Sequence, residues 1–254
     1  MASFKLRHTE HGRGDPLVLL HPIGLDRSFW SGLVERCAAT RRVIALDLPG
    51  HGQSPALAEI SMAAYVEAVK QTIDALGIGT AAVLGLSFGG MIAQEFAIRF
   101  PDRVSRLVAC ACGARMPPEA RDAVLARGRA ALDHGMSSVI DTTLERWFTP
   151  SFMDDPAVDR VRGRLLTDDA GQWNAGWSVI AAHDALDRLP NLAIPTLVVA
   201  GEMDRGTPVS AARAIADAVP GARLAVLSGA PHMLQIERPE PFARHVTAFL
   251  EERR

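Results

Sequence analysis

The chain has 254 residues, of which 48% are hydrophobic, and this length and composition can support a large buried core. Disordered and fibrous proteins are therefore excluded. The 27 Lys and Arg residues nearly balance the 29 Asp and Glu residues, so the net charge of −2 does not favour a nucleic-acid partner.

The sequence does not favour export or membrane insertion. No apolar run approaches the roughly 20 residues that cross a bilayer, and residues 1–8 carry charges where a signal peptide has its apolar stretch. The three cysteines, Cys37, Cys110 and Cys112, cannot all pair with one another, and their spacing is not that of a zinc site. We expect a cytoplasmic protein with no bound metal.

Short apolar runs alternate with helical segments in the first half of the chain. The predicted strands are 17–21, 42–46, 81–86 and 104–109, and the predicted helices are 61–76 and 88–100. Ser61 is placed as an N-cap, and Pro101 ends the second helix. Continuous apolar strands joined by helices are typical of a parallel sheet covered on both faces.

The alternation stops after Cys112 and resumes near residue 196. Between them only helical segments are predicted, among them 118–132 and 137–147. The last elements predicted are strands 196–200 and 223–227 and helices 208–219 and 240–251. We expect one α/β domain with a doubly wound, mostly parallel sheet, built from residues 1–113 and 190–254. A helical lid at 114–189 would cover the sheet edge where substrates bind.

The run Gly85-Leu86-Ser87-Phe88-Gly89 matches the G-x-S-x-G pattern between a predicted strand and a predicted helix. That context is typical of a nucleophile elbow, a strained turn that presents a serine at a helix N-terminus. The two glycines remove side chains that would collide in the turn. Ser87 is therefore the predicted nucleophile.

A serine nucleophile needs a base and an acid to orient that base. His232 follows the last predicted strand, as the order Ser…Asp…His requires, whereas His21 and His51 precede the serine. Asp204 follows the strand at 196–200 and is the predicted acid, with Glu202 as its local competitor.

Taken together, these motifs resemble the α/β-hydrolases, and Asp47-Leu48-Pro49-Gly50-His51-Gly52 is similar to that superfamily's turn after its fourth strand. Within it, the chain most resembles the 3-oxoadipate enol-lactonases. Two segments carry this similarity, Gly89-Gly90-Met91-Ile92-Ala93-Gln94 and Arg146-Trp147-Phe148-Thr149-Pro150-Ser151-Phe152.

The resemblance implies a Ser87–His232–Asp204 triad that hydrolyses a small ester or lactone without a cofactor. The superfamily usually has His-Gly after its first buried strand, but here Pro22 follows His21 and has no N–H to donate. By position, the oxyanion would be held by the backbone N–H groups of Ile23 and Phe88. The implied substrate is the enol-lactone of 3-oxoadipate, in bacterial aromatic degradation.

Four side chains are candidates for binding the substrate: Trp147 in the lid, and Arg27, Arg115 and Arg146, any of which could meet a substrate carboxylate. Other functions stay open at this point. They are a general carboxylesterase or other lactonase, a cofactor-free perhydrolase, a carbon–carbon bond hydrolase of ring-cleavage products, and a non-catalytic receptor of the same fold. The oligomeric state cannot be deduced from the sequence.

Overall fold

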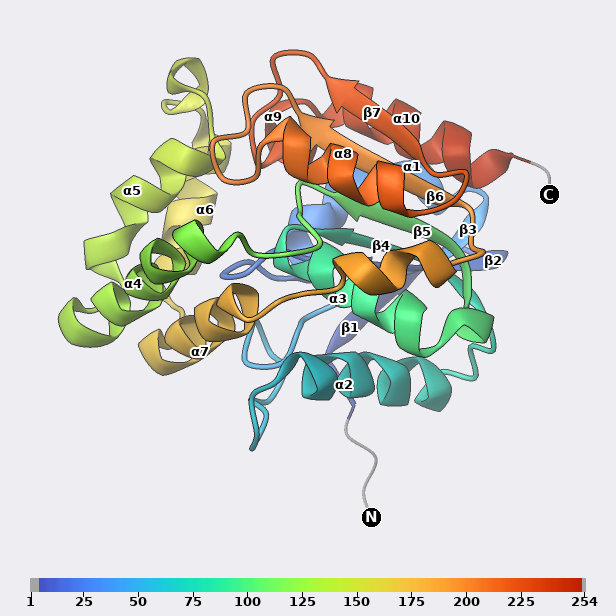
Figure 1. Cartoon of the computed structure of the whole chain (residues 1–254), viewed down its shortest axis with the longest axis horizontal. Helices are drawn as coiled ribbons and strands as arrows, with labels where there is room; N and C mark the ends of the chain where they lie inside the picture. The colour runs from blue at the N-terminus through green and yellow to red at the C-terminus, as the bar shows by residue number, and fades with distance from the viewer. Residues whose placement is uncertain (1–4, 253–254) are drawn as a thin grey trace.

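The computed structural model describes residues 5–252, and a seven-stranded sheet lies at its centre (Figure 1). The order is β1-β3-β2-β4-β5-β6-β7, with β1 antiparallel to β3 and every other neighbouring pair parallel. The strands are β1 (His8–His11), β2 (Asp15–Leu20), β3 (Arg41–Leu46), β4 (Ala81–Leu86), β5 (Val104–Cys110), β6 (Thr196–Gly201) and β7 (Arg223–Leu227). The predicted doubly wound, mostly parallel sheet is confirmed.

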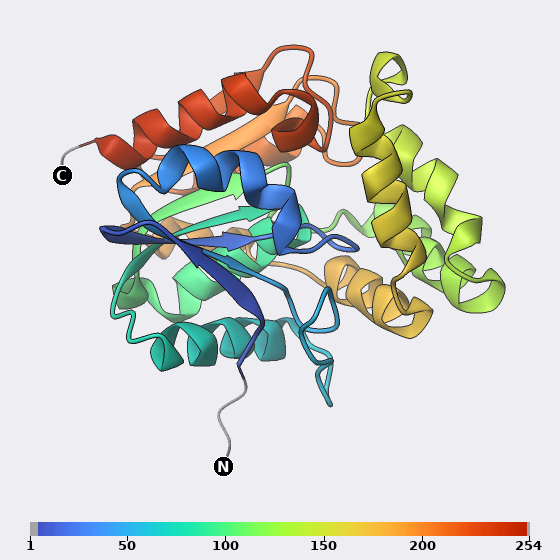
Figure 2. The same cartoon turned by 180° about the vertical axis from the view of Figure 1, so that it is seen from behind.

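Helices cover both faces of this sheet. α1 (Ser31–Cys37) and α10 (Pro239–Glu251) lie on the face seen in Figure 2. The opposite face carries α2 (Met62–Ala75), α3 (Phe88–Arg99) and α8 (Val209–Ala218) (Figure 1). The Ser61 hydroxyl accepts a hydrogen bond from the Ala64 N–H at 3.2 Å, so the predicted N-cap of α2 is confirmed.

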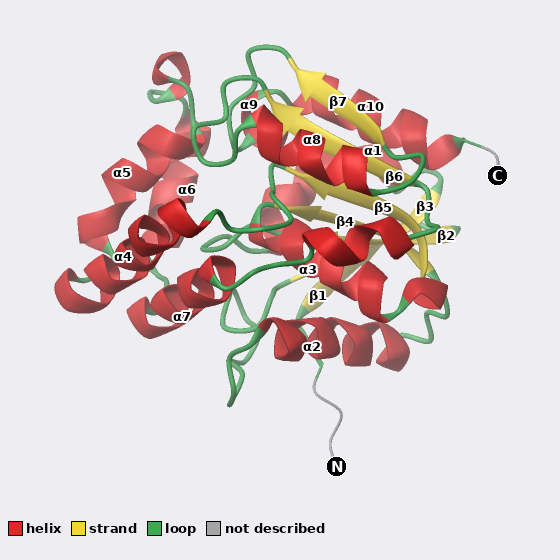
Figure 3. Ribbon diagram, in the orientation of Figure 1, coloured by secondary structure: helices red, strands yellow, loops and turns green. Residues whose placement is uncertain are grey.

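Four helices are inserted between β5 and β6, at the edge where the parallel strands end (Figures 1 and 3). They are α4 (Pro118–His134), α5 (Ser137–Trp147), α6 (Pro156–Leu166) and α7 (Ala170–Ala181). Four short 3₁₀ turns, at Arg27–Trp30, Pro101–Arg103, Pro150–Phe152 and Leu186–Asn191, and the one-turn α9 (Leu234–Glu237) complete the described elements.

Some elements were not predicted from the sequence. β1 has the polar sequence His-Thr-Glu-His and lies at the sheet edge, where pairing with β3 on one side suffices. The helix α1 is only seven residues long and carries no side-chain cap. Neither element has the periodic or continuous apolar pattern on which the predictions rested.

The core is one hydrophobic cluster that runs from the sheet into the inserted helices. It includes Val83 and Val108 of the strands as well as Leu144 and Leu165 of the insertion. The insertion is therefore packed on the sheet domain by apolar contacts. In the described part of the chain, no helix combines the length and the apolar character that a bilayer crossing requires.

Candidate active site

Ser87 lies in a strained turn between β4 and α3. Its φ of 54° and ψ of −116° lie outside the regions that side-chain-bearing residues favour, which costs on the order of 1–3 kcal/mol. The Ser87 N–H donates to the Cys110 carbonyl at 2.8 Å, so the end of β5 holds the turn in place. The hydroxyl thereby stands at the N-terminus of α3, as predicted for a nucleophile elbow.

The two glycines of the motif are required by close packing. A Cβ at Gly85 would overlap the Gly89 carbonyl, and a Cβ at Gly89 would overlap the carbonyls of Leu20 and His21. Because all of these neighbours are main chain, they cannot move aside as a flexible side chain could. The sequence analysis expected side chains at these two positions to collide in the turn, and the geometry agrees with that reason.

A chain of hydrogen bonds joins Ser87 to two buried side chains. His232 Nε2 lies 2.9 Å from Ser87 Oγ, and His232 Nδ1 lies 2.8 Å from Asp204 Oδ2. His232 is 4% exposed and Asp204 is 8% exposed, so little solvent weakens these contacts. The three residues predicted as a triad therefore meet at one place.

Asp204 is itself held by the main chain. Its Oδ1 accepts hydrogen bonds from the N–H groups of Gly206 at 2.7 Å and Thr207 at 2.8 Å. That leaves Oδ2 to accept the His232 Nδ1–H, which directs the unprotonated Nε2 at the serine. Glu202 is turned elsewhere, since its carboxylate accepts from the Ser228 hydroxyl and the Gly229 N–H. These hydrogen bonds lower the Glu202 pKa.

His21 and His51, which were weighed against His232 as the base, have structural contacts. His21 Nδ1 bonds the Pro22 carbonyl at 2.7 Å, and His21 Nε2 accepts from the Leu48 N–H at 2.8 Å, so both nitrogens are occupied. Burial lowers the pKa of His21 to about 4 and that of His51 to about 3. Both rings are neutral at pH 7, and they lie 5.2 Å apart.

The predicted oxyanion donors, the N–H groups of Ile23 and Phe88, are free. Within residues 5–252, neither N–H donates a hydrogen bond to a protein acceptor. Ile23 borders the same cavity as Ser87, and Phe88 begins α3 directly after the nucleophile. The assignment of these two groups as the oxyanion hole stays a prediction that this arrangement permits.

Ser87 and His232 open into a cavity of about 930 Å³ between the sheet edge and the inserted helices. Trp147 lines this cavity and stacks on the His232 ring, with centroids 6.3 Å apart and planes at 28°. Its carbonyl also accepts from the Met233 N–H at 3.0 Å. The C-terminus of α5 is thus docked on the loop that carries His232.

The three arginines predicted as carboxylate ligands lie in different surroundings. Arg27 is outside the cavity, and its guanidinium pairs with the buried Asp47. Arg115 lines the cavity but is bound to Asp184 at 2.9 Å and to Asp187 at 2.5 Å. Arg146 lines the cavity and has no ion-pair partner among residues 5–252.

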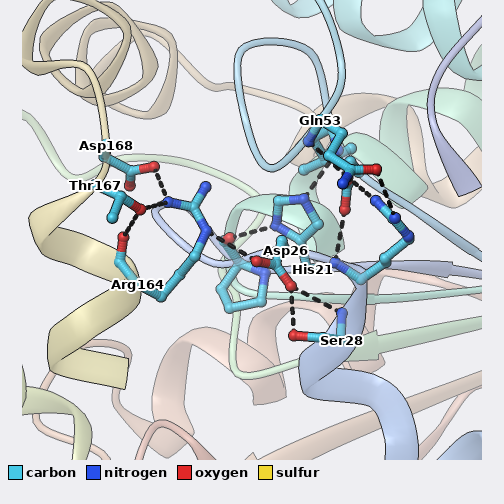
Figure 4. Close-up of polar contacts among 11 residues, drawn as sticks. His21, Asp26, Ser28, Gln53, Arg164, Thr167 and Asp168 are labelled. Atoms are coloured by element: carbon cyan, nitrogen blue, oxygen red, sulfur yellow. Dashed lines mark hydrogen bonds and ion pairs between the residues drawn. The ribbon is translucent and has the colours of Figure 1, made fainter. Parts of the chain in front are cut away.

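A polar cluster ties the inserted helices to the loop after β2 (Figure 4). Arg164 of α6 lies 2.6 Å from Asp168 and 2.9 Å from Asp26. Asp26 also accepts from the N–H and hydroxyl of Ser28, which fixes the end of the loop that includes Ile23. Burial raises the pKa of Asp168 to about 7 in spite of the arginine beside it.

Sequence reasoning missed Arg127, Arg164 and the cavity-lining role of Trp177. The guanidinium of Arg127 lies 5.2 Å from the centre of the Trp177 ring, and both side chains border the cavity. The Trp177 ring also meets the Trp173 ring edge to face, with their centroids 5.6 Å apart. No sequence motif identifies Arg127 or Arg164 as a site residue, because the surroundings of each side chain depend on how separate helices pack.

The described residues contain no group of three or more His, Cys, Asp or Glu side chains that is suited to a metal ion. The hydrogen-bonded Ser87, His232 and Asp204, with two free backbone N–H groups beside them, form an arrangement that can carry out nucleophilic acyl transfer.

A family model of the alpha/beta hydrolase fold matches residues 15–239. The chain belongs to this family. The expected resemblance to 3-oxoadipate enol-lactonases is also confirmed. The 3-oxoadipate enol-lactonase 2 of Acinetobacter baylyi is 28% identical, over 97% of this chain and 93% of that protein.

Other relatives carry different names. The (E)-2-((N-methylformamido)methylene)succinate hydrolase of A. baylyi is 29% identical, over 95% of this chain and 92% of that protein. The crystal structure of the enol-lactonase from Burkholderia xenovorans superposes with a TM-score of 0.91 at 29% identity, covering 97% of this chain and 96% of that one. These relatives, at 28–29% identity, share the fold with this chain but are named for different substrates.

Proposed function

We propose that this protein hydrolyses an ester or lactone bond through an acyl-enzyme formed on Ser87. The observation that carries the proposal is the continuous chain of hydrogen bonds from Ser87 through His232 to Asp204, at 2.9 and 2.8 Å, beside a large cavity. A nucleophile within hydrogen-bond reach of a base that a third group orients is the signature of this chemistry.

In the first half of the reaction, His232 Nε2 takes the proton of Ser87 as Oγ attacks the substrate carbonyl. The carbonyl oxygen becomes an anion, which in this proposal is stabilised by the N–H groups of Ile23 and Phe88. Removal of one such donor typically costs about 3–4 kcal/mol of transition-state stabilisation. Asp204 stabilises the imidazolium that forms at the same time.

In the second half, the imidazolium gives its proton to the departing oxygen, and the acyl group stays on Ser87. His232 then takes a proton from water, and the hydroxide attacks the acyl carbon. As the bond from that carbon to Ser87 Oγ breaks, His232 returns the proton to Oγ, which releases a carboxylic acid and the free serine. When the substrate is a lactone, the departing oxygen remains part of the acyl group. A single ring-opened product then leaves the cavity.

For the substrate, we propose the enol-lactone of 3-oxoadipate, converted in the cytoplasm to 3-oxoadipate. Three observations support this choice: the relatives named enol-lactonases, a cavity of small-molecule size, and an unpaired arginine in its wall. A carboxylesterase for neutral esters is the second candidate, because Met91, Val124 and Trp177 make parts of that wall apolar.

Purified protein should be assayed on the enol-lactone, on a neutral lactone and on 4-nitrophenyl esters, with product release followed directly. We expect kcat/KM to be highest for the enol-lactone. Ser87→Ala should reduce turnover on every substrate by about 10⁴-fold or more, as for other triad nucleophiles. A variant that kept a tenth of wild-type turnover would exclude the serine mechanism, and a preference for neutral esters would exclude the enol-lactone alone.

A further inference from the structure

Two arginines of the inserted helices face the active-site cavity without an acidic partner. Arg127 comes from α4 and Arg146 from α5, and both line the cavity that contains Ser87. Among residues 5–252, neither guanidinium forms an ion pair or a hydrogen bond with a protein group. Arg115, in the same wall, is neutralised by Asp184 and Asp187.

The positive charges of Arg127 and Arg146 also repel each other. Burial and the nearby Arg146 lower the pKa of Arg127 to about 10, so its guanidinium remains charged at pH 7 but is less stable in that form than in water. The contact with the Trp177 ring offsets part of this cost. Glu119 is the one acidic residue among those lining the cavity, and it pairs with neither arginine.

The wall beside Arg127 is made of small side chains. Ala123, Ala126 and Ala130 of α4 all line the cavity, so a guanidinium at 127 has open space beside it. On α5, Thr142 and Thr143 precede Arg146 by about one turn and line the same cavity. The next residue after Arg146 is Trp147, which stacks on His232, so this positive region begins beside the catalytic groups.

We propose that Arg127 and Arg146 together form a subsite for a free carboxylate of the substrate. The substrate class is accordingly an ester or lactone whose reacting carbonyl lies at Ser87 while a second, ionised carboxyl group reaches the two guanidiniums. This inference rests on the proposed hydrolase function and deepens it, because it assigns the residues that hold the carboxylate of an anionic substrate. A carboxylate placed there would remove the repulsion between the arginines and form charge-assisted hydrogen bonds with them.

The test uses two substrates of nearly equal shape, the mono-4-nitrophenyl ester of adipic acid and its methyl ester, which lacks the negative charge. For the wild-type protein, we expect a higher kcat/KM on the acid than on the methyl ester. Arg127→Met and Arg146→Met should each reduce the acid-to-ester ratio of kcat/KM by about ten- to hundredfold, through KM more than through kcat. Methionine keeps much of the side-chain volume while it removes the charge.

Arg129→Met is the matched control, because Arg129 is an exposed arginine of the same helix that does not line the cavity. We expect this variant to keep the wild-type ratio. Thermal melts of all three variants should show that they are folded. An acid-to-ester ratio unchanged in both cavity variants, or lowered equally in Arg129→Met, would overturn the subsite.

Binding of adipate and of its neutral diamide, measured by calorimetry, separates this inference from the proposed reaction. If the wild-type protein binds adipate, and Arg127→Met loses that binding by tenfold or more, the subsite is supported even without ester hydrolysis. Conversely, hydrolysis of both esters that depends on Ser87, combined with equal binding of adipate and the diamide, would overturn the subsite and leave the proposed reaction intact.

Discussion

At Ser87 the backbone and the side chain have opposing requirements. The positive φ of this turn suits glycine, whereas the proposed chemistry needs a hydroxyl at the same position. The surrounding structure holds the strained conformation through the Cys110 carbonyl and the packing of Gly85 on Gly89. The strained conformation therefore lowers the stability of the folded protein at the residue that is the proposed nucleophile.

A comparison of Ser87→Gly with Ser87→Ala isolates this strain, since both variants lack the hydroxyl. We expect Ser87→Gly to have the larger free energy of unfolding, by about 1 kcal/mol. Strain relief on the order of 1–3 kcal/mol is partly offset by the greater freedom of glycine in the unfolded chain. Urea denaturation at pH 7 would measure the difference. A glycine variant less stable than the alanine variant would show that the turn is not strained.

The acid of the triad can be tested against its neighbour. Asp204→Asn should lower kcat by about 10⁴-fold, because the amide favours the wrong tautomer of His232. Glu202→Gln should have a mild effect, since Glu202 bonds only Ser228 and Gly229. Steady-state kinetics on a 4-nitrophenyl ester would measure both. The reverse order of effects would assign the acid to Glu202.

At the scale of helices and strands, the contact between α6 and the loop after β2 is unusual because its charged side chains are largely buried. Gly24 in that loop has a φ of +76°, and a Cβ there would overlap Leu165 and Trp173 of the insertion. Arg164 and Asp168 lie beside this contact, and both side chains are largely buried, at 12% and 6% exposed. The insertion therefore packs closely against the loop that carries Ile23, the proposed oxyanion donor.

The burial of Asp168 at this contact predicts that stability depends on pH. The pKa of Asp168 is about 7 in the folded protein, above its ordinary value near 3.8. Between about pH 4 and pH 7 the folded state thus holds a proton that the unfolded state has released, so this group's contribution to stability falls as pH rises. We expect Asp168→Asn to flatten the decline of the melting temperature between pH 5 and pH 8.

Asp122→Asn on the exposed surface of α4 serves as the control, and its melting temperatures should follow those of the wild type across the same range. If the wild type and Asp168→Asn lose the same number of degrees between pH 5 and pH 8, Asp168 does not titrate in this window.

The elements differ in how well the sequence predicts them. β4 and α5 were predicted with their observed bounds, because β4 is a continuous apolar run and the buried residues of α5 recur at helical spacing. The bounds of α6 and α7 were not predicted, although both begin after an aspartate N-cap, Asp155 and Asp169. Ser87, His232 and Asp204 could be found from motif and order. Arg127 could not, because its surroundings depend on how α4 and α7 pack.

For the whole molecule, the continuity of the hydrophobic cluster predicts cooperative unfolding. Leu144 and Leu165 of the insertion belong to the same cluster as Val83 and Val108 of the sheet. We expect differential scanning calorimetry to show one transition, with an enthalpy of about 180 kcal/mol near 60 °C from the usual value per residue. Two resolved transitions, or a van't Hoff enthalpy near half the calorimetric one, would mean that the inserted helices unfold separately.

The bond between the Trp147 carbonyl and the Met233 N–H has a consequence for how such a protein can diversify. It joins main chain to main chain, so it does not depend on which side chain occupies either position. The proposed carboxylate ligands and the aromatic cover of His232 all come from one uninterrupted stretch, residues 118–147. Exchange of that single stretch between relatives could therefore change the preferred substrate while the alignment of nucleophile, base and acid is inherited intact.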